Sequence, residues 1–91
     1  MNIDAITNAH FQRLTRELGG LYAVQVNVGG AWRESTLGKY HSPRDGAVAP
    51  VSLMLQLCQL TDDWLWLDAI NLIAEREYVA RDPRQGGRDD E

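Results

Sequence analysis

The sequence predicts an all-α domain of four to five helices. Apolar residues recur at three- and four-residue steps through most of the first 80 residues, which is the period of an amphipathic helix. Glycine pairs and prolines divide this pattern into short segments. The last stretch, residues 81–91 (RDPRQGGRDDE), lacks the apolar side chains that a core needs. We therefore expect one domain over residues 1–80 and a disordered acidic tail over residues 81–91.

Residues 3–18 form the first expected helix. Its inward side is built from residues three or four apart, with Phe11 beside them: Ile3, Ile6, His10, Leu14 and Leu18. Asn2 or Asp4 is placed to cap its start. Gly19-Gly20 is expected to end it, because glycine tolerates the left-handed conformation just past a helix.

The pattern of residues 21–28, LYAVQVNV, is compatible with either a β-strand or a helix. Tyr and Val at every second position are typical of a strand, and Gly29-Gly30 would then make a two-residue hairpin turn. The partner strand would be residues 31–40, AWRESTLGKY, and neither side of it is apolar. A lone two-stranded sheet is also weak unless helices cover it. We therefore expect helices here and keep a hairpin over residues 21–40, in an α+β domain, as the alternative.

The helical interpretation gives two short helices. Leu21, Val24 and Val28 form one stripe. A second helix runs from residue 32 or 33 to Tyr40, with Leu37 and Tyr40 facing inward. Pro43 ends it, because proline disfavours helical geometry in the residue before it.

Two longer helices follow a loop over residues 44–49. Pro50 suits the first turn of the helix over residues 51–60, which is nearly all apolar and is expected at the centre of the core. Its inward residues are Leu53, Leu57 and Leu60, with Met54 and Cys58 beside them. Thr61-Asp62-Asp63 is expected to break this helix and cap the next, over residues 64–80. There we expect Leu65, Ala69, Leu72 and Ile73 to face inward, while Trp66, Ile70 and Tyr78 widen the apolar surface.

Charge and cysteine content narrow the function classes. The net charge is −4, but residues 1–45 are slightly basic and residues 46–91 are strongly acidic. This asymmetry permits a front half that faces nucleic acid. The single cysteine excludes an internal disulfide and favours a reducing, cytoplasmic setting. No secretory signal or membrane span is expected, and no spacing indicates a metal site, a cofactor or an enzyme.

The order of several motifs resembles the small helix-turn-helix transcriptional regulators of phages and proteobacteria. The motifs are Gly19-Gly20, Ser35-Thr36-Leu37 with Tyr40 and Pro43, Pro50, and Leu60-Thr61-Asp62. They cover about two-thirds of the chain, from Gly19 to about Ala74. The turn before the expected reading helix is longer than in this family by a residue or two. Arg33 also stands where the family favours a Ser or Thr cap.

This resemblance implies that the chain binds double-stranded DNA and regulates transcription as a homodimer. Residues 32–41 would enter the major groove, where Arg reads guanine and Ser or Thr meets bases or phosphates. The expected DNA-binding residues are Arg33, Ser35, Thr36, Lys39 and His41, with Arg44 and, from the first helix, Arg13 or Arg16. The expected dimer interface is the surplus aromatic surface of Trp64, Trp66 and Tyr78.

A protein–protein module is the alternative function. In that case the same helical scaffold would dock on a host protein, as a phage-type inhibitor or adaptor, with the Trp-bearing last helix as its anchor. The acidity of the chain and the long turn fit this alternative.

Overall fold

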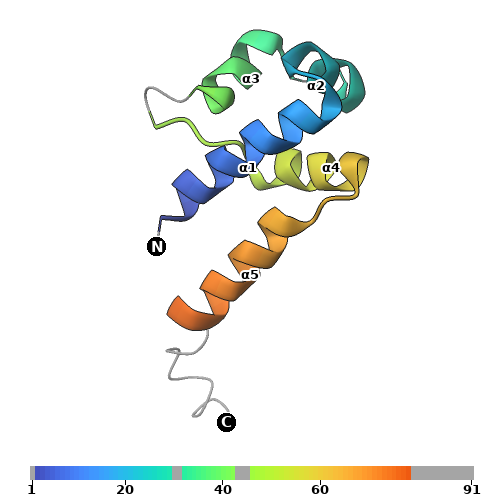
Figure 1. Ribbon diagram of the computed structural model, residues 1–91. Helices are drawn as coiled ribbons and strands as arrows, with labels where there is room; N and C mark the ends of the chain where they lie inside the picture. Colours follow the sequence, from blue (N-terminus) through green and yellow to red (C-terminus); the bar gives the residue numbers. More distant parts are fainter. Residues whose placement is uncertain (1, 30–31, 43–45, 79–91) are drawn as a thin grey trace, which may run out of the picture.

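The computed structural model describes residues 2–29, 32–42 and 46–78, and all regular structure in these ranges is helical (Figure 1). The helices are α1 (Ile3–Leu18), α2 (Leu21–Val28), α3 (Glu34–His41), α4 (Val51–Thr61) and α5 (Leu65–Glu77). The all-α prediction is confirmed, and the hairpin alternative is wrong for the described part of residues 21–40. The expected tail over residues 81–91 lies outside the described residues. None of the helices in the described ranges is long and apolar enough to cross a lipid bilayer.

Local chemistry sets both ends of α1, as the sequence predicts. The Asn2 side chain accepts a hydrogen bond from the backbone N–H of Ala5 at 3.1 Å, which caps the start of the helix. Gly19 follows the helix with a φ of 109°, in the left-handed region that favours glycine. The N–H groups of Gly19 and Gly20 both donate to the carbonyl oxygen of Thr15, at 3.1 and 2.9 Å. The chain therefore turns sharply and begins α2 at Leu21.

α1 forms the centre of the fold, since it packs against each of the other four helices (Figure 1). The fully buried core side chains come from four helices: Phe11 and Leu14 from α1, Val24 from α2, Leu37 from α3, and Leu53, Met54, Leu57 and Cys58 from α4. The central place expected for residues 51–60 is thus confirmed. Leu60 is an exception, because 44% of it is exposed and it does not belong to the core.

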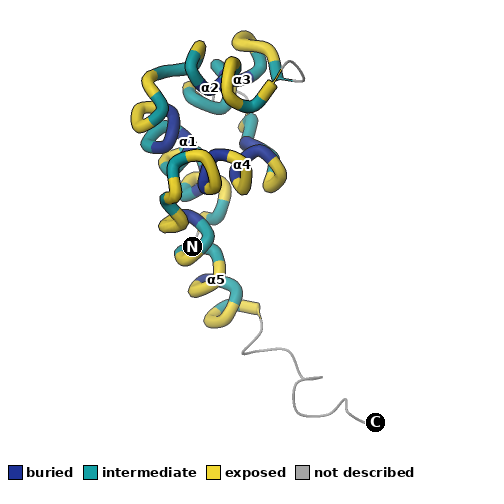
Figure 2. The backbone as a smooth tube through the Cα atoms, turned by 90° about the vertical axis from the view of Figure 1, so that its right-hand side faces the viewer, coloured by how far each residue is buried: buried dark blue, intermediate teal, exposed yellow. Residues whose placement is uncertain are grey.

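α5 packs in a different rotation from the one that the sequence predicts. Leu65 and Leu72, expected to face inward, are 58% and 47% exposed. Trp66 and Ile73 are buried instead, so the expected burial of Ile73 alone is confirmed. The reason is that α5 has one extensive helical neighbour, α1, and the side of α5 that meets it is centred on Trp66 and Ile73. Figure 2 shows how α5 extends from the other helices with many exposed residues.

The connection between α4 and α5 also departs in part from the prediction. Asp62 does not cap α5 but ends α4, in the left-handed conformation with a φ of 53°. Asp63 does take part at the start of α5, where its carboxylate accepts a hydrogen bond from the N–H of Leu65 at 3.2 Å. The Thr61 hydroxyl donates back to the carbonyl oxygen of Leu57 at 2.8 Å. Each polar residue of this connection thus has a local backbone role.

Candidate nucleic-acid interface

α2 and α3 are two short helices that pack against each other and against α1. Their inner sides carry Val24 and Leu37, both fully buried. Side chains packed at the density of a protein interior leave little freedom for the helices that carry them. The buried side chains of α2 and α3 therefore hold the two helices in a fixed mutual orientation.

Further contacts fix the rotation of α3. The Tyr40 ring packs edge-on against Phe11 of α1, with 5.9 Å between ring centroids, and against Trp32, with 6.5 Å. The side-chain amide of Gln12 donates a hydrogen bond to the carbonyl oxygen of His41 at 2.6 Å. The inward orientation expected for Leu37 and Tyr40 is confirmed. Consequently the opposite side of α3 faces away from the domain.

Three of the predicted DNA-binding residues lie exposed on or beside this outer side. Ser35 and Lys39 are one helical turn apart on α3, and Arg33 immediately precedes the helix. The Arg33 side chain makes no capping hydrogen bond. Thr36 and His41 are half-buried, and Arg44 lies outside the described residues. The outer side of α3 therefore presents a hydroxyl and a cation, and the start of the helix carries a second cation, Arg33, beside the exposed acidic Glu34.

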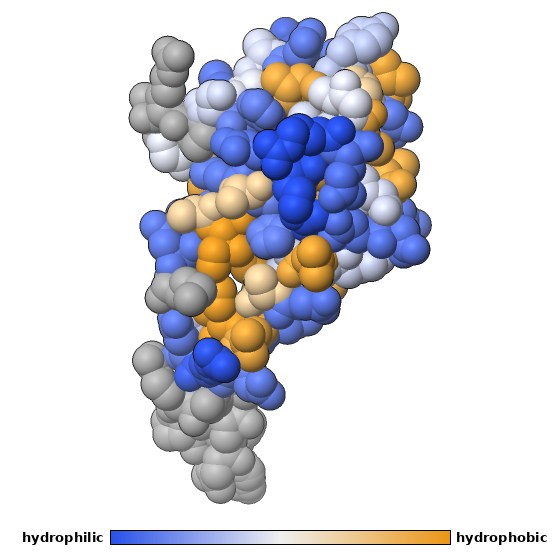
Figure 3. All heavy atoms as spheres, in the orientation of Figure 1, coloured by the Kyte–Doolittle hydropathy of each residue, from blue (hydrophilic) through white to orange (hydrophobic). Residues whose placement is uncertain are grey.

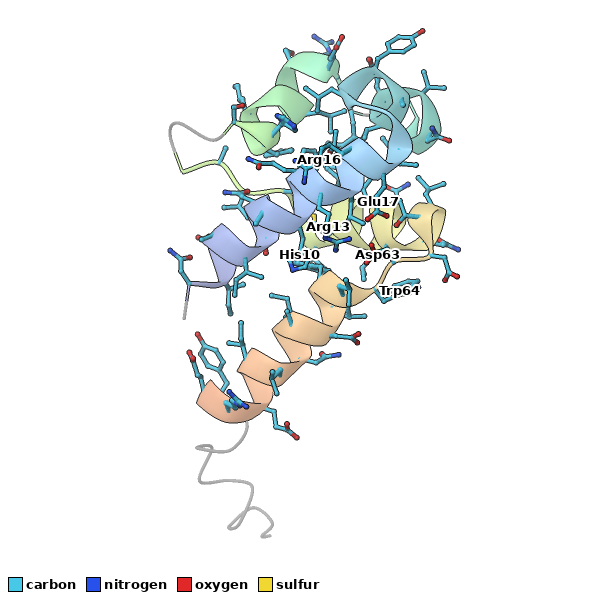
Figure 4. All side chains as sticks on the ribbon, viewed as in Figure 1. His10, Arg13, Arg16, Glu17, Asp63 and Trp64 are labelled. Carbon is cyan, nitrogen blue, oxygen red and sulfur yellow. The ribbon has the colours of Figure 1, made fainter. Side chains whose placement is uncertain are left out.

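Arg13, predicted to contact DNA phosphate, is half-buried and paired with other side chains of the chain (Figure 4). Its guanidinium donates to the Asp63 carboxylate and to Oε2 of Glu17, the latter at 2.8 Å. A further N–H of the guanidinium lies 2.7 Å from Nδ1 of His10. Asp63 is 50 residues away in the sequence, so the pair ties α1 to the connection between α4 and α5. Arg13 therefore has a structural role in the fold, and the phosphate contact predicted for Arg13 or Arg16 stays a prediction.

This cluster shifts two pKa values downward. Burial lowers the pKa of His10, the positive charge of Arg13 lowers it further, and the charge of Asp63 opposes both. The hydrogen bond from Arg13 lowers the pKa of Asp63. Arg13 thus favours a neutral imidazole and an ionised carboxylate on either side of it.

Arg16 has a different environment from Arg13. It is exposed in the last turn of α1. Figure 4 shows it on the edge of α1 nearer α2 and α3, whereas His10, Arg13 and Asp63 lie toward α5. Of the two arginines predicted in the first helix, only Arg16 is placed to meet a ligand that lies against α3.

The three predicted interface aromatics do not share one surface. Trp66 is only 3% exposed, and its indole Nε1 donates to Oγ1 of the buried Thr7 at 3.0 Å. It is a core residue, and its prediction as an interface residue is wrong. The spacing of Trp66, Ile70 and Ile73 at three and four residues is the signal that would have revealed this. Trp64 and Tyr78, at either end of α5, are 38% and 56% exposed.

Two exposed apolar surfaces of the fold were not expected from the sequence. On α2, Tyr22 and Val26 are 70% and 62% exposed and lie one turn apart. On α5, Leu65 and Leu72 are exposed, as described above. Figure 3 shows apolar side chains gathered between α1 and α5, below a strongly hydrophilic patch over α1.

Comparisons with known proteins give no relative, since no protein-family model, no curated protein and no solved structure matches this chain.

Proposed function

We propose that this protein is a DNA-binding regulator of transcription that places α3 in the major groove of a duplex. The observation that carries the proposal is the two-sided character of α3. Its inner side is locked to the core through the fully buried Leu37, and its outer side exposes Ser35 and Lys39. A rigidly held helix with free polar and cationic side chains meets the geometric need of groove recognition.

Each exposed residue has a distinct role in this proposal. Arg33 donates two hydrogen bonds to the acceptors of a guanine, and Ser35 contacts a base edge or a phosphate. Lys39 and Arg16 neutralise phosphates on either side of the groove. The half-buried Thr36 and His41 are secondary contacts.

The net charge of −4 makes non-specific binding weak, because that binding depends on phosphate neutralisation. An eight-residue helix also reads few base pairs. Useful affinity therefore requires two copies of α3 on one site, and we propose a homodimer that binds two half-sites. The cytoplasm is the compartment that fits this function and a lone, fully buried cysteine.

A binding assay with a matched control tests the proposal. A duplex is first selected from a random-sequence pool, and its affinity is then measured by fluorescence anisotropy. We expect Lys39→Glu to weaken binding by about tenfold or more and to lower the salt dependence by about one to two released ions. The control is the double variant Ser52→Glu/Gln56→Glu, which places the same change of net charge on two exposed residues one turn apart on α4. Equal effects of the two variants, or selection of no duplex at all, would contradict the proposal.

Docking on another protein is the second candidate. It is favoured by the exposure of Trp64 and Tyr78, since aromatic residues are common anchors of interfaces. In that case Lys39→Glu leaves partner binding intact, while Tyr78→Ala weakens it.

A further inference from the structure

α5 carries an apolar stripe that the fold leaves uncovered. Leu65 and Leu72 are seven residues apart, which places them on the same side of a helix. Ala69 lies between them and is half-buried. The buried side of α5, with Trp66 and Ile73, is the one that meets α1. The stripe therefore lies beside the core contact and faces solvent over two turns.

Two opposite charges stand symmetrically about Leu72, at the C-terminal end of this stripe. Asp68 precedes Leu72 by four residues, and Arg76 follows it by four. Residues four apart are neighbours on one side of a helix, so both charges flank Leu72. Both side chains are exposed.

We propose that a second copy of this chain covers the C-terminal end of the stripe, with the two α5 helices antiparallel across a two-fold axis at Leu72. A two-fold axis brings each residue opposite the one at the same distance on the other side of the axis. Leu72 then meets Leu72 of the second copy, and Asp68 of each copy meets Arg76 of the other. The arrangement buries the exposed Leu72 of both copies and pairs Asp68 with Arg76 twice.

The expected dimer is a weak one. α5 has 13 residues and is about 20 Å long, so a single pair of such helices gives an interface below the standard size. We expect association at micromolar concentrations, strengthened when both copies hold one duplex. The need for a dimer rests on the proposed function, whereas the surface is inferred from α5 alone.

The helix dipole gives a competing explanation for the two charges. Asp68 lies in the first turn of α5 and Arg76 in the last, where an acid and a base each stabilise an isolated helix. That explanation needs no second copy. It predicts that reversing either charge lowers the stability of the monomer and does nothing else.

Mixing two charge-reversed variants separates these explanations. In Asp68→Arg alone, arginines face arginines across the axis, and in Arg76→Asp alone, aspartates face aspartates. When the two variants are mixed, both contacts join opposite charges. We expect sedimentation equilibrium to show the wild-type mass rising from 10.2 kDa toward twice that value. Each single variant should associate about tenfold more weakly, and the mixture should recover the wild-type affinity.

Two further variants complete the test. Leu72→Asp should abolish association while the circular dichroism spectrum stays helical, because the side chain is exposed in the monomer. Tyr78→Ala, which removes an exposed aromatic residue outside the stripe, should leave association unchanged. The proposal is overturned if the chain stays monomeric at all concentrations, if the mixture associates no better than its components, or if Tyr78→Ala abolishes the dimer in place of Leu72→Asp. None of these measurements contains DNA, so a failure of the DNA-binding proposal leaves their outcome untouched.

Discussion

Thr7 and Thr15 offer a matched pair of substitutions within one helix. Both are buried in α1, at 4% and 1% exposure. The Thr7 hydroxyl oxygen accepts the indole N–H of Trp66 at 3.0 Å, whereas the Thr15 hydroxyl oxygen has no hydrogen-bond partner among the described residues. Val has nearly the same shape as Thr, and both are β-branched, so helix propensity changes little on substitution. The two substitutions therefore differ mainly in the hydrogen bond that they remove.

Thr7→Val should destabilise the protein, and Thr15→Val should not. The first leaves a buried indole N–H unpaired, which costs about 2 kcal/mol and lowers the melting temperature by about 10 °C in a domain of this size. The second removes a buried hydroxyl that already lacks a partner, so we expect a change between zero and about 1 kcal/mol in favour of the folded state. Thermal and urea unfolding followed by circular dichroism measure both values.

A third substitution, Trp66→Phe, tests whether the stability lost in Thr7→Val comes from the hydrogen bond between Trp66 and Thr7. In a Trp66→Phe background the donor is absent, so Thr7→Val should cost much less than in the wild type. Equal losses for Thr7→Val and Thr15→Val would show that α5 does not dock on α1 through this hydrogen bond. A larger loss for Thr15→Val would refute the packing of α1 described above.

Three further predictions concern stability. The pKa of His10 is lowered in the folded state, so folded His10 takes up a proton less readily than it does in the unfolded chain. The protein therefore has its full stability above the unfolded pKa of 6.5 and loses stability as pH falls below that value. Melting curves of His10→Gln should lack this loss, and an unchanged pH profile of the variant would exclude His10 as its source. Gly38→Ala should raise the melting temperature by about 5 °C, because a Cβ there lies 4.0 Å from the nearest side chain and Ala favours a helix; a lower melting temperature would contradict the helical state of α3. Asp63→Asn should cost about 1 kcal/mol through its bond to Arg13, while the same change at the neighbouring Asp62 should cost little, since Asn tolerates the left-handed conformation. Urea unfolding decides this last comparison, and equal losses at the two positions would argue against the ion pair.

Much of the fold follows from local sequence signals. Gly19-Gly20 ends α1, and Leu53 and Leu57 lie in the core, as the pattern of residues predicts. The helical state of residues 21–28 is harder to predict from the sequence, because alternating valines also fit a strand. The absence of an apolar partner strand decided that question correctly.

The candidate site was predictable only in part. The exposure of Arg33, Ser35 and Lys39 agrees with the helical pattern, since Leu37 and Tyr40 define the opposite side of α3. The DNA-binding role of these exposed residues remains a proposal. The pairing of Arg13 was not predictable, because a surface arginine and one paired within the fold carry the same sequence signal.

The sequence by itself determined, to within one residue, where α1, α2 and α4 begin and end, and it determined which side of α3 and α4 is apolar. Those properties depend on backbone preferences and side-chain spacing within a few residues. Only the tertiary structure decided the rotation of α5, the burial of Trp66 and the pairing of Arg13. Each of these depends on residues brought together from at least 50 positions apart, Thr7 with Trp66 and Arg13 with Asp63. α5 is apolar over more than one side, so its sequence permits several rotations, and contact with α1 selects one and leaves Leu65 and Leu72 in solvent.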